Sequence, residues 1–135
     1  MGSKRSLEAT DPIFALIAEH RSADGELAKA VTAADLRDHE TLRARELETA
    51  RDKAWEIERD CMWRLISTAP TTIEGLAALL GYSRERGSMS ALIRPEWQHA
   101  FEWTIECAVC ALAGLPRPPK TEIVAEVWDE QTDHA

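Results

Sequence analysis

The chain has 135 residues, of which 44% are hydrophobic, and a formal net charge of -8. This length fits one domain with a single core, and the excess of acidic residues disfavours nonspecific binding to nucleic acid. The longest apolar runs, such as Ala77 to Leu80, are far shorter than the roughly 20 residues that cross a bilayer, and the amino terminus lacks the apolar stretch of a secretory signal, so we expect a soluble, cytoplasmic protein with no membrane segment.

The first predicted helix begins at Asp11 and Pro12. The aspartate can accept hydrogen bonds from free backbone amides, and a proline at the first helical position loses no hydrogen bond. From Ile13 onward, apolar residues recur every three or four positions, which keeps one face of a helix continuous. We expect this helix to run to about Asp38 or to bend near Gly25, because glycine weakens a helix interior.

The second predicted helix extends from about Glu40 to Ala69 and has the clearest pattern. Acidic and basic residues are interleaved over most of its surface, as on a solvated face, and Pro70 ends it. With the first helix it is expected to form a long antiparallel hairpin. Its apolar stripe consists of Leu47, Ala50, Ala54, Ile57, Cys61 and Leu65.

A third, shorter helix is predicted from Thr72. Thr71 and Glu74 form a capping box, in which each side chain satisfies the free backbone amide of the other residue. Gly81 is placed to end the helix in a left-handed conformation, and residues 83–90 are expected to form a short helix or an ordered loop. The predicted buried face consists of Ile73, Leu76, Ala77 and Leu80.

The last predicted helix starts near Pro95 and runs to about Leu115. Apolar side chains cover nearly all of its circumference and leave only a narrow polar stripe. A helix of this kind is either central in a fold or paired with another chain.

A proline-rich spacer at residues 116–119 and an acidic tail at 122–135 follow the last helix. We expect the tail to be irregular. The predicted fold is therefore all-α, with a single helical domain at residues 1–115 and the spacer and tail at 116–135. The apolar tail residues that could dock onto the helices are Ile123, Val127 and Trp128.

The cysteines predict neither a disulfide framework nor a metal site. Cys61, Cys107 and Cys110 form an odd count, which indicates reduced thiols. Cys107-x-x-Cys110 has redox or metal spacing, but it lacks a second ligand pair and a βαβ context. Cys61 and His99 could complete a set of four ligands only if the second and last helices crossed at that level. We interpret the cysteines as core residues and expect no cofactor.

A metal-dependent enzyme is a weaker alternative. Glu96-x-x-His99 resembles an element of di-iron bundles, but those bundles need two such motifs. His20 lies on an apolar stripe without a nearby nucleophile pattern, so we interpret it as a satisfied, half-buried histidine and assign no catalytic residue. The residues around which a metal site would form are His99, Glu102, Glu106 and Cys107.

Residues 72–84 resemble the opening of a helix-turn-helix. Gly81 would make the turn, and Ser83 would cap a recognition helix that carries Arg84 and Arg86. The motif then needs an apolar residue at position 87, where this chain has Gly87. A DNA-binding regulator that uses the two arginines is therefore an alternative function.

Two segments carry a resemblance to a known family. Residues 11–21, DPIFALIAEHR, and residues 69–80, APTTIEGLAALL, are similar to the hallmarks of a family of short, uncharacterised helical proteins that are abundant in alphaproteobacteria. The likeness extends loosely to residues 97–115, and the proline-rich tail departs from the family pattern. The resemblance implies a long helical hairpin followed by two shorter helices, and it implies no known activity.

The preferred interpretation is a non-enzymatic helical protein that interacts with a protein partner or forms a homodimer. Five tryptophans are many for this length, and tryptophan is favoured as an interface anchor. The residues predicted to form the interface are Trp97, Phe101 and Trp103.

Overall fold

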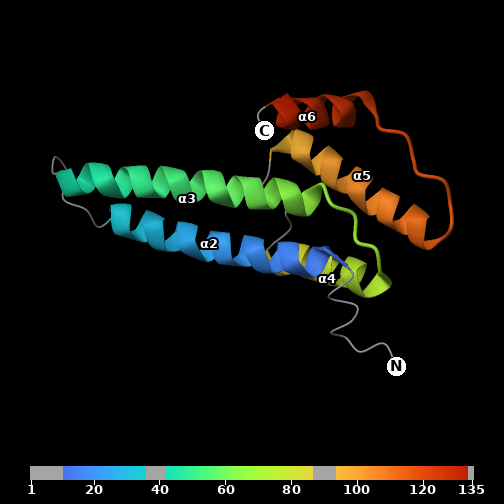
Figure 1. Cartoon of the computed structure of the whole chain (residues 1–135), viewed down its shortest axis with the longest axis horizontal. Helices are drawn as coiled ribbons and strands as arrows, with labels where there is room; N and C mark the ends of the chain where they lie inside the picture. Colours follow the sequence, from blue (N-terminus) through green and yellow to red (C-terminus); the bar gives the residue numbers. More distant parts are fainter. Residues whose placement is uncertain (1–10, 36–41, 87–93, 134–135) are drawn as a thin grey trace. The chain divides into compact units, whose positions relative to one another are not determined.

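A computed structural model describes residues 11–35, 42–86 and 94–133. Within these ranges the chain forms five helices and no strands, which confirms the all-α prediction. None of these helices is both long and apolar enough to cross a membrane. The helices are α2 (Ile13–Asp35), α3 (Leu42–Ile66), α4 (Ile73–Glu85), α5 (Pro95–Leu112) and α6 (Glu122–Asp133), shown in Figure 1.

The helices group into two compact units. One unit, Leu16–Leu65, contains most of α2 and nearly all of α3. The other unit contains the first turn of α2 together with α4, α5 and α6. The predicted boundary between a domain at 1–115 and a tail at 116–135 stays a prediction.

In the first unit, α2 and α3 lie side by side and run in opposite directions (Figure 1). The Nε2 atom of His20 on α2 lies 2.8 Å from Oε1 of Glu58 on α3. Glu19 forms an ion pair with Arg64, with 3.1 Å between Oε2 and Nη1. Polar contacts therefore join the two helices, which we call the α2–α3 pair.

In the second unit, the side chain of Asp11 connects the start of α2 to the start of α4. Asp11 is fully buried, and its Oδ1 accepts a hydrogen bond from the N–H of Ile13 at 3.1 Å. Its Oδ2 accepts from the N–H groups of Thr71 at 3.2 Å and Thr72 at 3.0 Å, and from the Thr72 hydroxyl at 2.7 Å. Amides at and before a helix start lack intrahelical partners, so this carboxylate satisfies groups that burial would otherwise leave unpaired. We call this arrangement the Asp11 clasp.

The cap of α4 differs from the predicted one by one residue. Thr72 is the N-cap, and its hydroxyl oxygen accepts a hydrogen bond from the N–H of Gly75 at 2.9 Å. The capping box expected from Thr71 and Glu74 is therefore wrong. The Thr72 hydroxyl donates to Asp11 and accepts from Gly75, so both of its hydrogen-bonding functions are used in this register.

α4 continues past Gly81, where the sequence predicted its end, and stops only at Glu85. A glycine inside a helix costs about 1 kcal/mol relative to alanine, which a helix can tolerate when tertiary contacts favour it. Such a contact exists here, because Tyr82 is only 2% exposed. Burial of the tyrosine ring stabilises the extra turn.

The face of α4 that packs inward also differs from the predicted one. The buried residues of the helix are Gly75, Leu79 and Tyr82, whereas Ile73 is 68% exposed and Leu80 is 44% exposed. The Asp11 clasp holds Gly75 directly against the start of α2. The close contact at Gly75 therefore determines which face of α4 is buried. Ile73 and Leu80 lie on the face that remains exposed.

α5 ends at a glycine in the left-handed conformation. Gly114 has φ of 72° and donates its N–H to the carbonyl of Ala111 at 3.2 Å, while Leu115 donates to the carbonyl of Cys110 at 2.8 Å. These two bonds form a Schellman motif, which satisfies carbonyls at the helix end. The helix therefore stops at Leu112 rather than near Leu115.

The predicted irregular tail is helical, so that expectation is wrong for residues 122–133. The Thr121 hydroxyl accepts from the N–H of Val124 at 3.3 Å, as an N-cap does. Val124 and Val127 are 2% and 3% exposed, and α6 packs against α5, which in turn contacts α4. Burial of this apolar stripe favours a helix although the segment is acidic.

We expect Asp11→Asn to lower the free energy of unfolding by about 1–3 kcal/mol, because an amide nitrogen would replace one oxygen and leave a buried donor unpaired. Asp11→Ala should cost more, since all four hydrogen bonds are lost. Urea denaturation of both variants measures the effect. Asp35→Asn at an exposed position is the control and should change stability by less than about 0.5 kcal/mol. Equal stability of Asp11→Ala and the unsubstituted chain would contradict the clasp.

Alanine at Gly75 and alanine at Gly81 should have opposite effects. A Cβ at Gly75 would collide with Oδ2 of Asp11 and lie 2.7 Å from its Cγ, whereas a Cβ at Gly81 meets nothing within 4 Å. Gly75→Ala should therefore destabilise the chain by about 1–3 kcal/mol. Gly81→Ala should stabilise it by up to about 1 kcal/mol through helix propensity. Thermal denaturation compares the two, and a stabilising Gly75→Ala would show that Asp11 is not held against the helix.

Candidate interaction groove

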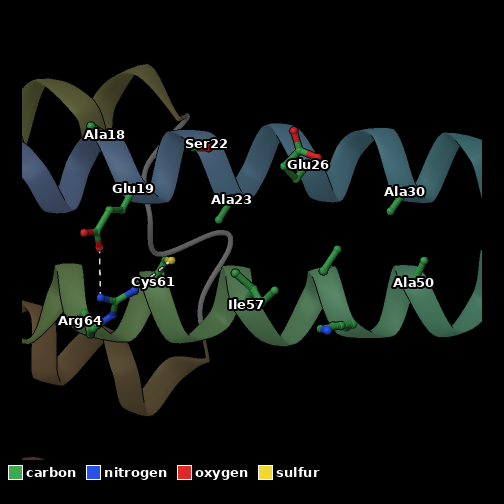
Figure 2. A pocket seen from close by; sticks show the side chains of 12 residues that line it. Ala18, Glu19, Ser22, Ala23, Glu26, Ala30, Ala50, Ile57, Cys61 and Arg64 are labelled. Atoms are coloured by element: carbon green, nitrogen blue, oxygen red, sulfur yellow. Dashed lines mark hydrogen bonds and ion pairs between the residues drawn. The ribbon is translucent and has the colours of Figure 1, made fainter.

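An open groove of about 830 Å³ runs along one face of the α2–α3 pair (Figure 2). Ala23 of α2 and Ile57 of α3 point into the space between the two ribbons in this view. We call it the α2–α3 groove. Its lining residues are Ala18, Glu19, Ser22, Ala23, Glu26 and Ala30 from α2, and Ala50, Lys53, Ala54, Ile57, Cys61 and Arg64 from α3.

The groove exists because the facing side chains are small. Five of the lining residues are alanines, which leave room between the helices that larger residues would fill. The apolar stripe predicted for the second helix is also wider than the contact with α2. Leu65 of that stripe is fully buried, but Ile57 is 49% exposed and lines the groove. The stripe thus supplies both the core of this unit and an uncovered apolar surface.

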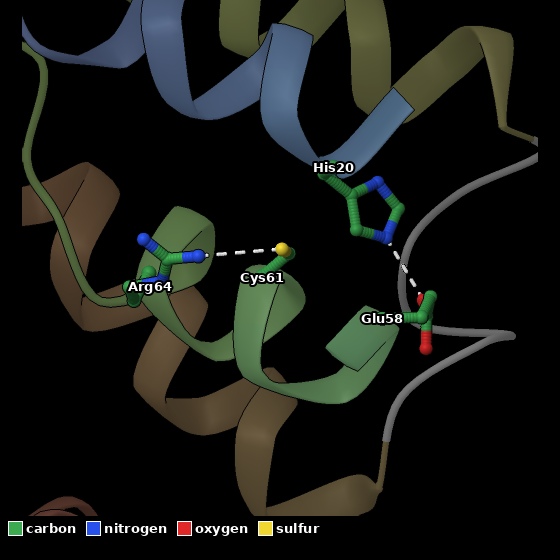
Figure 3. Close-up of polar contacts among 4 residues, drawn as sticks. All are labelled: His20, Glu58, Cys61 and Arg64. Carbon is green, nitrogen blue, oxygen red and sulfur yellow. Dashed lines mark hydrogen bonds and ion pairs between the residues drawn. The ribbon is translucent and has the colours of Figure 1, made fainter. Parts of the chain in front are cut away.

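Charged residues of opposite sign line the two walls. Glu19 and Glu26 belong to α2, whereas Lys53 and Arg64 belong to α3. Arg64 pairs with Glu19 and also donates to the sulfur of Cys61 at 3.3 Å (Figure 3). Glu26 and Lys53 are exposed, and among the residues that the structure describes Glu26 forms an ion pair only with the surface Lys29, at 3.3 Å. The acidic wall and the basic wall therefore each keep an accessible charge.

His20 lies near one end of the α2–α3 pair and is fully buried rather than half-buried. Its contact with Glu58 is shown in Figure 3 beside the separate contact between Arg64 and Cys61. A buried imidazole with a carboxylate partner is satisfied, as the sequence predicted. The arrangement indicates a structural role in holding α2 against α3.

The predicted interface residues of α5 lie mostly inside the chain. Trp97 is 4% exposed and Trp103 is 7% exposed, whereas Phe101 is half-buried. Burial of the two tryptophans is already complete within one copy of the chain, so they cannot insert into a partner without leaving their own unit. The structure thus places Trp103 in a buried cluster of the second unit, together with Cys107 and Val124.

Trp103 also anchors the proline-rich spacer. Its indole N–H donates to the carbonyl of Pro118 at 3.2 Å, and its ring meets that of Trp128 edge to face at 5.2 Å between centroids. The guanidinium of Arg117 lies 4.9 Å from the Trp103 ring, and the ammonium of Lys120 lies 4.9 Å from the Trp128 ring. Cation–π and edge-to-face contacts of this kind hold α6 and the spacer against α5.

The two arginines of the DNA-binding alternative do not lie on a recognition helix. Arg84 is in the last turn of α4, and Arg86 is the residue that caps its end. The predicted turn at Gly81 is absent, because α4 passes through it, and no helix starts at Ser83. Residues 87–90 of the segment lie outside the described ranges.

Metal-binding geometry is not found in the described part of the chain. No three histidine, cysteine or acidic side chains there lie close enough together to hold a metal ion. His99, Glu102 and Glu106 are exposed, and Cys107 is buried. The three cysteines are free thiols. The alternative of a metal-dependent enzyme gains no geometric support.

Sequence reasoning missed the groove as a site. The signal was present in the alanines that recur at helical spacing in both α2 and α3, but a small side chain predicts an open surface only when its partner helix is known. The charge separation between the walls was equally visible, and it becomes meaningful only once Glu19 is seen beside Arg64.

No family model, curated protein or solved structure matches the chain. The resemblance to the alphaproteobacterial family stays a prediction.

We expect Trp97→Ala to lower the free energy of unfolding by about 3–5 kcal/mol, because a buried indole leaves a large cavity. Trp55→Ala is the matched control, since Trp55 is 50% exposed. It should cost much less. Urea denaturation followed by circular dichroism measures both, and a stability of Trp97→Ala close to that of Trp55→Ala would show that Trp97 lies at a surface instead.

Proposed function

We propose that the chain is a non-enzymatic helical interaction protein and that the α2–α3 groove is its binding surface. The observation that carries this proposal is the open groove of about 830 Å³ with an apolar lining. Contiguous apolar surface of this kind is characteristic of sites that bind another protein. The proposal includes a cytoplasmic location and the family resemblance, for which the support comes from the sequence.

The shape of the groove supports an α-helix as the bound element. An amphipathic helix binds by laying its apolar side chains, spaced three and four residues apart, between two receptor helices. Alanines at the walls permit the close approach of a helix, and Ile57 offers a large apolar contact at 49% exposure. The charged residues on the rim would fix the orientation of the bound helix.

The binding surface proposed here lies on the first two helices instead of on α5. Trp97 and Trp103 are buried within a single chain, which leaves them unsuited to serve as anchors for a partner. No observation favours DNA binding, since Arg84 and Arg86 sit at the end of α4 and the chain is acidic.

Two neighbouring positions on α3 test the proposal. Ile57 and Trp55 are 49% and 50% exposed, but only Ile57 lines the groove. Ile57→Asp should weaken the binding of a partner, or of a second copy, by about ten-fold or more, because a carboxylate would be desolvated in the groove. Trp55→Asp should leave binding unchanged.

The measurements are sedimentation of the purified chain and quantitative capture of proteins from a lysate of the organism that produces it. Circular dichroism of both variants confirms that they are folded. Assemblies that are lost equally in both variants, or in neither variant, would contradict a role for the groove.

A further inference from the structure

We infer that the occupant of the α2–α3 groove is a second copy of this chain. In the dimer, two α2–α3 pairs pack groove to groove and form a four-helix bundle. This inference rests on the proposed function, because it names the partner of the same groove. Two observations support it: the distribution of charge on the two walls and the shape of the apolar surface between them.

The charges of the groove are complementary to those of a second copy. The acidic residues Glu19 and Glu26 are on α2, and the basic residues Lys53 and Arg64 are on α3. A two-fold axis parallel to the helices places α2 of one copy over α3 of the other. Each residue keeps its position along the bundle axis, so residues at one level in one copy face residues at the same level in the other. Each acidic wall then faces a basic wall, and the contact occurs twice because the interface is symmetric.

The positions of Glu26 and Lys53 along the helix axes are compatible with this arrangement. Glu19 and Arg64 are at one level, since they form an ion pair at 3.1 Å within the chain. Glu26 lies about two turns along α2 from that level, and Lys53 lies about three turns along α3 in the same direction. The remaining offset is about one turn, roughly 6 Å, which a lysine side chain can span.

The side chain of Lys53 is available for an ion pair with another chain. It lines the groove and is exposed, and among the described residues it forms no ion pair or hydrogen bond. Within the described ranges Glu26 pairs only with Lys29, one turn away. Both side chains are largely exposed, and such surface pairs contribute little. Pairing Glu26 with Lys53 of a second copy would give both groove charges a partner in a partly desolvated setting.

The apolar contacts of the two copies are also complementary. The α3 wall carries a projecting side chain, Ile57, whereas the α2 wall is shallow on either side of Glu26 because Ala23 and Ala30 are small. Ile57 lies about two turns along α3 from Arg64, so in the dimer it is level with Glu26 of the other copy and inserts beside these two alanines. Helices with small residues at the contact can pack closely, as in four-helix bundles.

The test exchanges the charges between two variants of the full chain. Glu26→Lys alone places two lysines opposite each other at both contacts of its own dimer, and Lys53→Glu alone places two glutamates there. Each variant by itself should dimerise about ten-fold or more weakly than the unsubstituted chain. An equimolar mixture should recover the dimer, because every contact then joins a lysine to a glutamate.

Sedimentation over a range of concentrations measures the dissociation constants, and mass spectrometry of the intact complex identifies the mixed dimer. Arg45→Glu and Glu56→Lys are controls with the same changes in charge at exposed α3 positions outside the groove. Both should dimerise like the unsubstituted chain. Circular dichroism verifies that every variant is helical.

Three results would overturn the inference. The unsubstituted chain could remain monomeric at all concentrations, the single variants could dimerise normally, or the mixture could fail to recover a dimer. A monomer whose capture of another protein is lost with Ile57→Asp but kept with Trp55→Asp would preserve the proposed function and exclude only the second copy as the occupant.

Discussion

The buried carboxylate of Asp11 is the constraint on which the second unit depends. It accepts hydrogen bonds from Ile13 at the start of α2 and from Thr71 and Thr72 about sixty residues later, before α4. Because a buried carboxylate must keep its partners, the two helix starts are held together at a fixed distance and orientation. Gly75 is required at the closest approach, and its position determines which side of α4 turns inward.

The first unit is built on a different principle. Two helices cannot enclose a wide apolar stripe between them, so part of the stripe on α3 stays at the surface. Leu65 is fully buried, whereas Ile57 remains half outside, in a groove that alanines keep open. The contacts of His20 with Glu58 and of Glu19 with Arg64 hold the pair together at one end and leave the groove uncovered. The proposed function follows from this incomplete burial.

Burial changes the role that can be assigned to Trp97 and Trp103. Trp97 and Trp103 were the best candidates for an interface as long as α5 was considered by itself, because it is apolar on nearly every side. α6 and the proline-rich spacer cover part of that surface, with Trp128 against Trp103 and Lys120 near both rings. An apolar helix that is central in its own unit needs no second chain. The interface is therefore better sought where apolar surface remains exposed.

The sequence by itself determined the helical class and the approximate positions of four helices, because these depend on local signals: the spacing of apolar residues, the Asp11-Pro12 start, and the stops and starts at Pro70 and Pro95. It did not determine that the acidic tail is helical, since that depends on burial of Val124 against another part of the chain. Only the tertiary structure decided which face of α4 is buried and which residues of α3 line a groove. Periodicity shows which side chains share a face of a helix, but contacts between distant residues decide which face is covered.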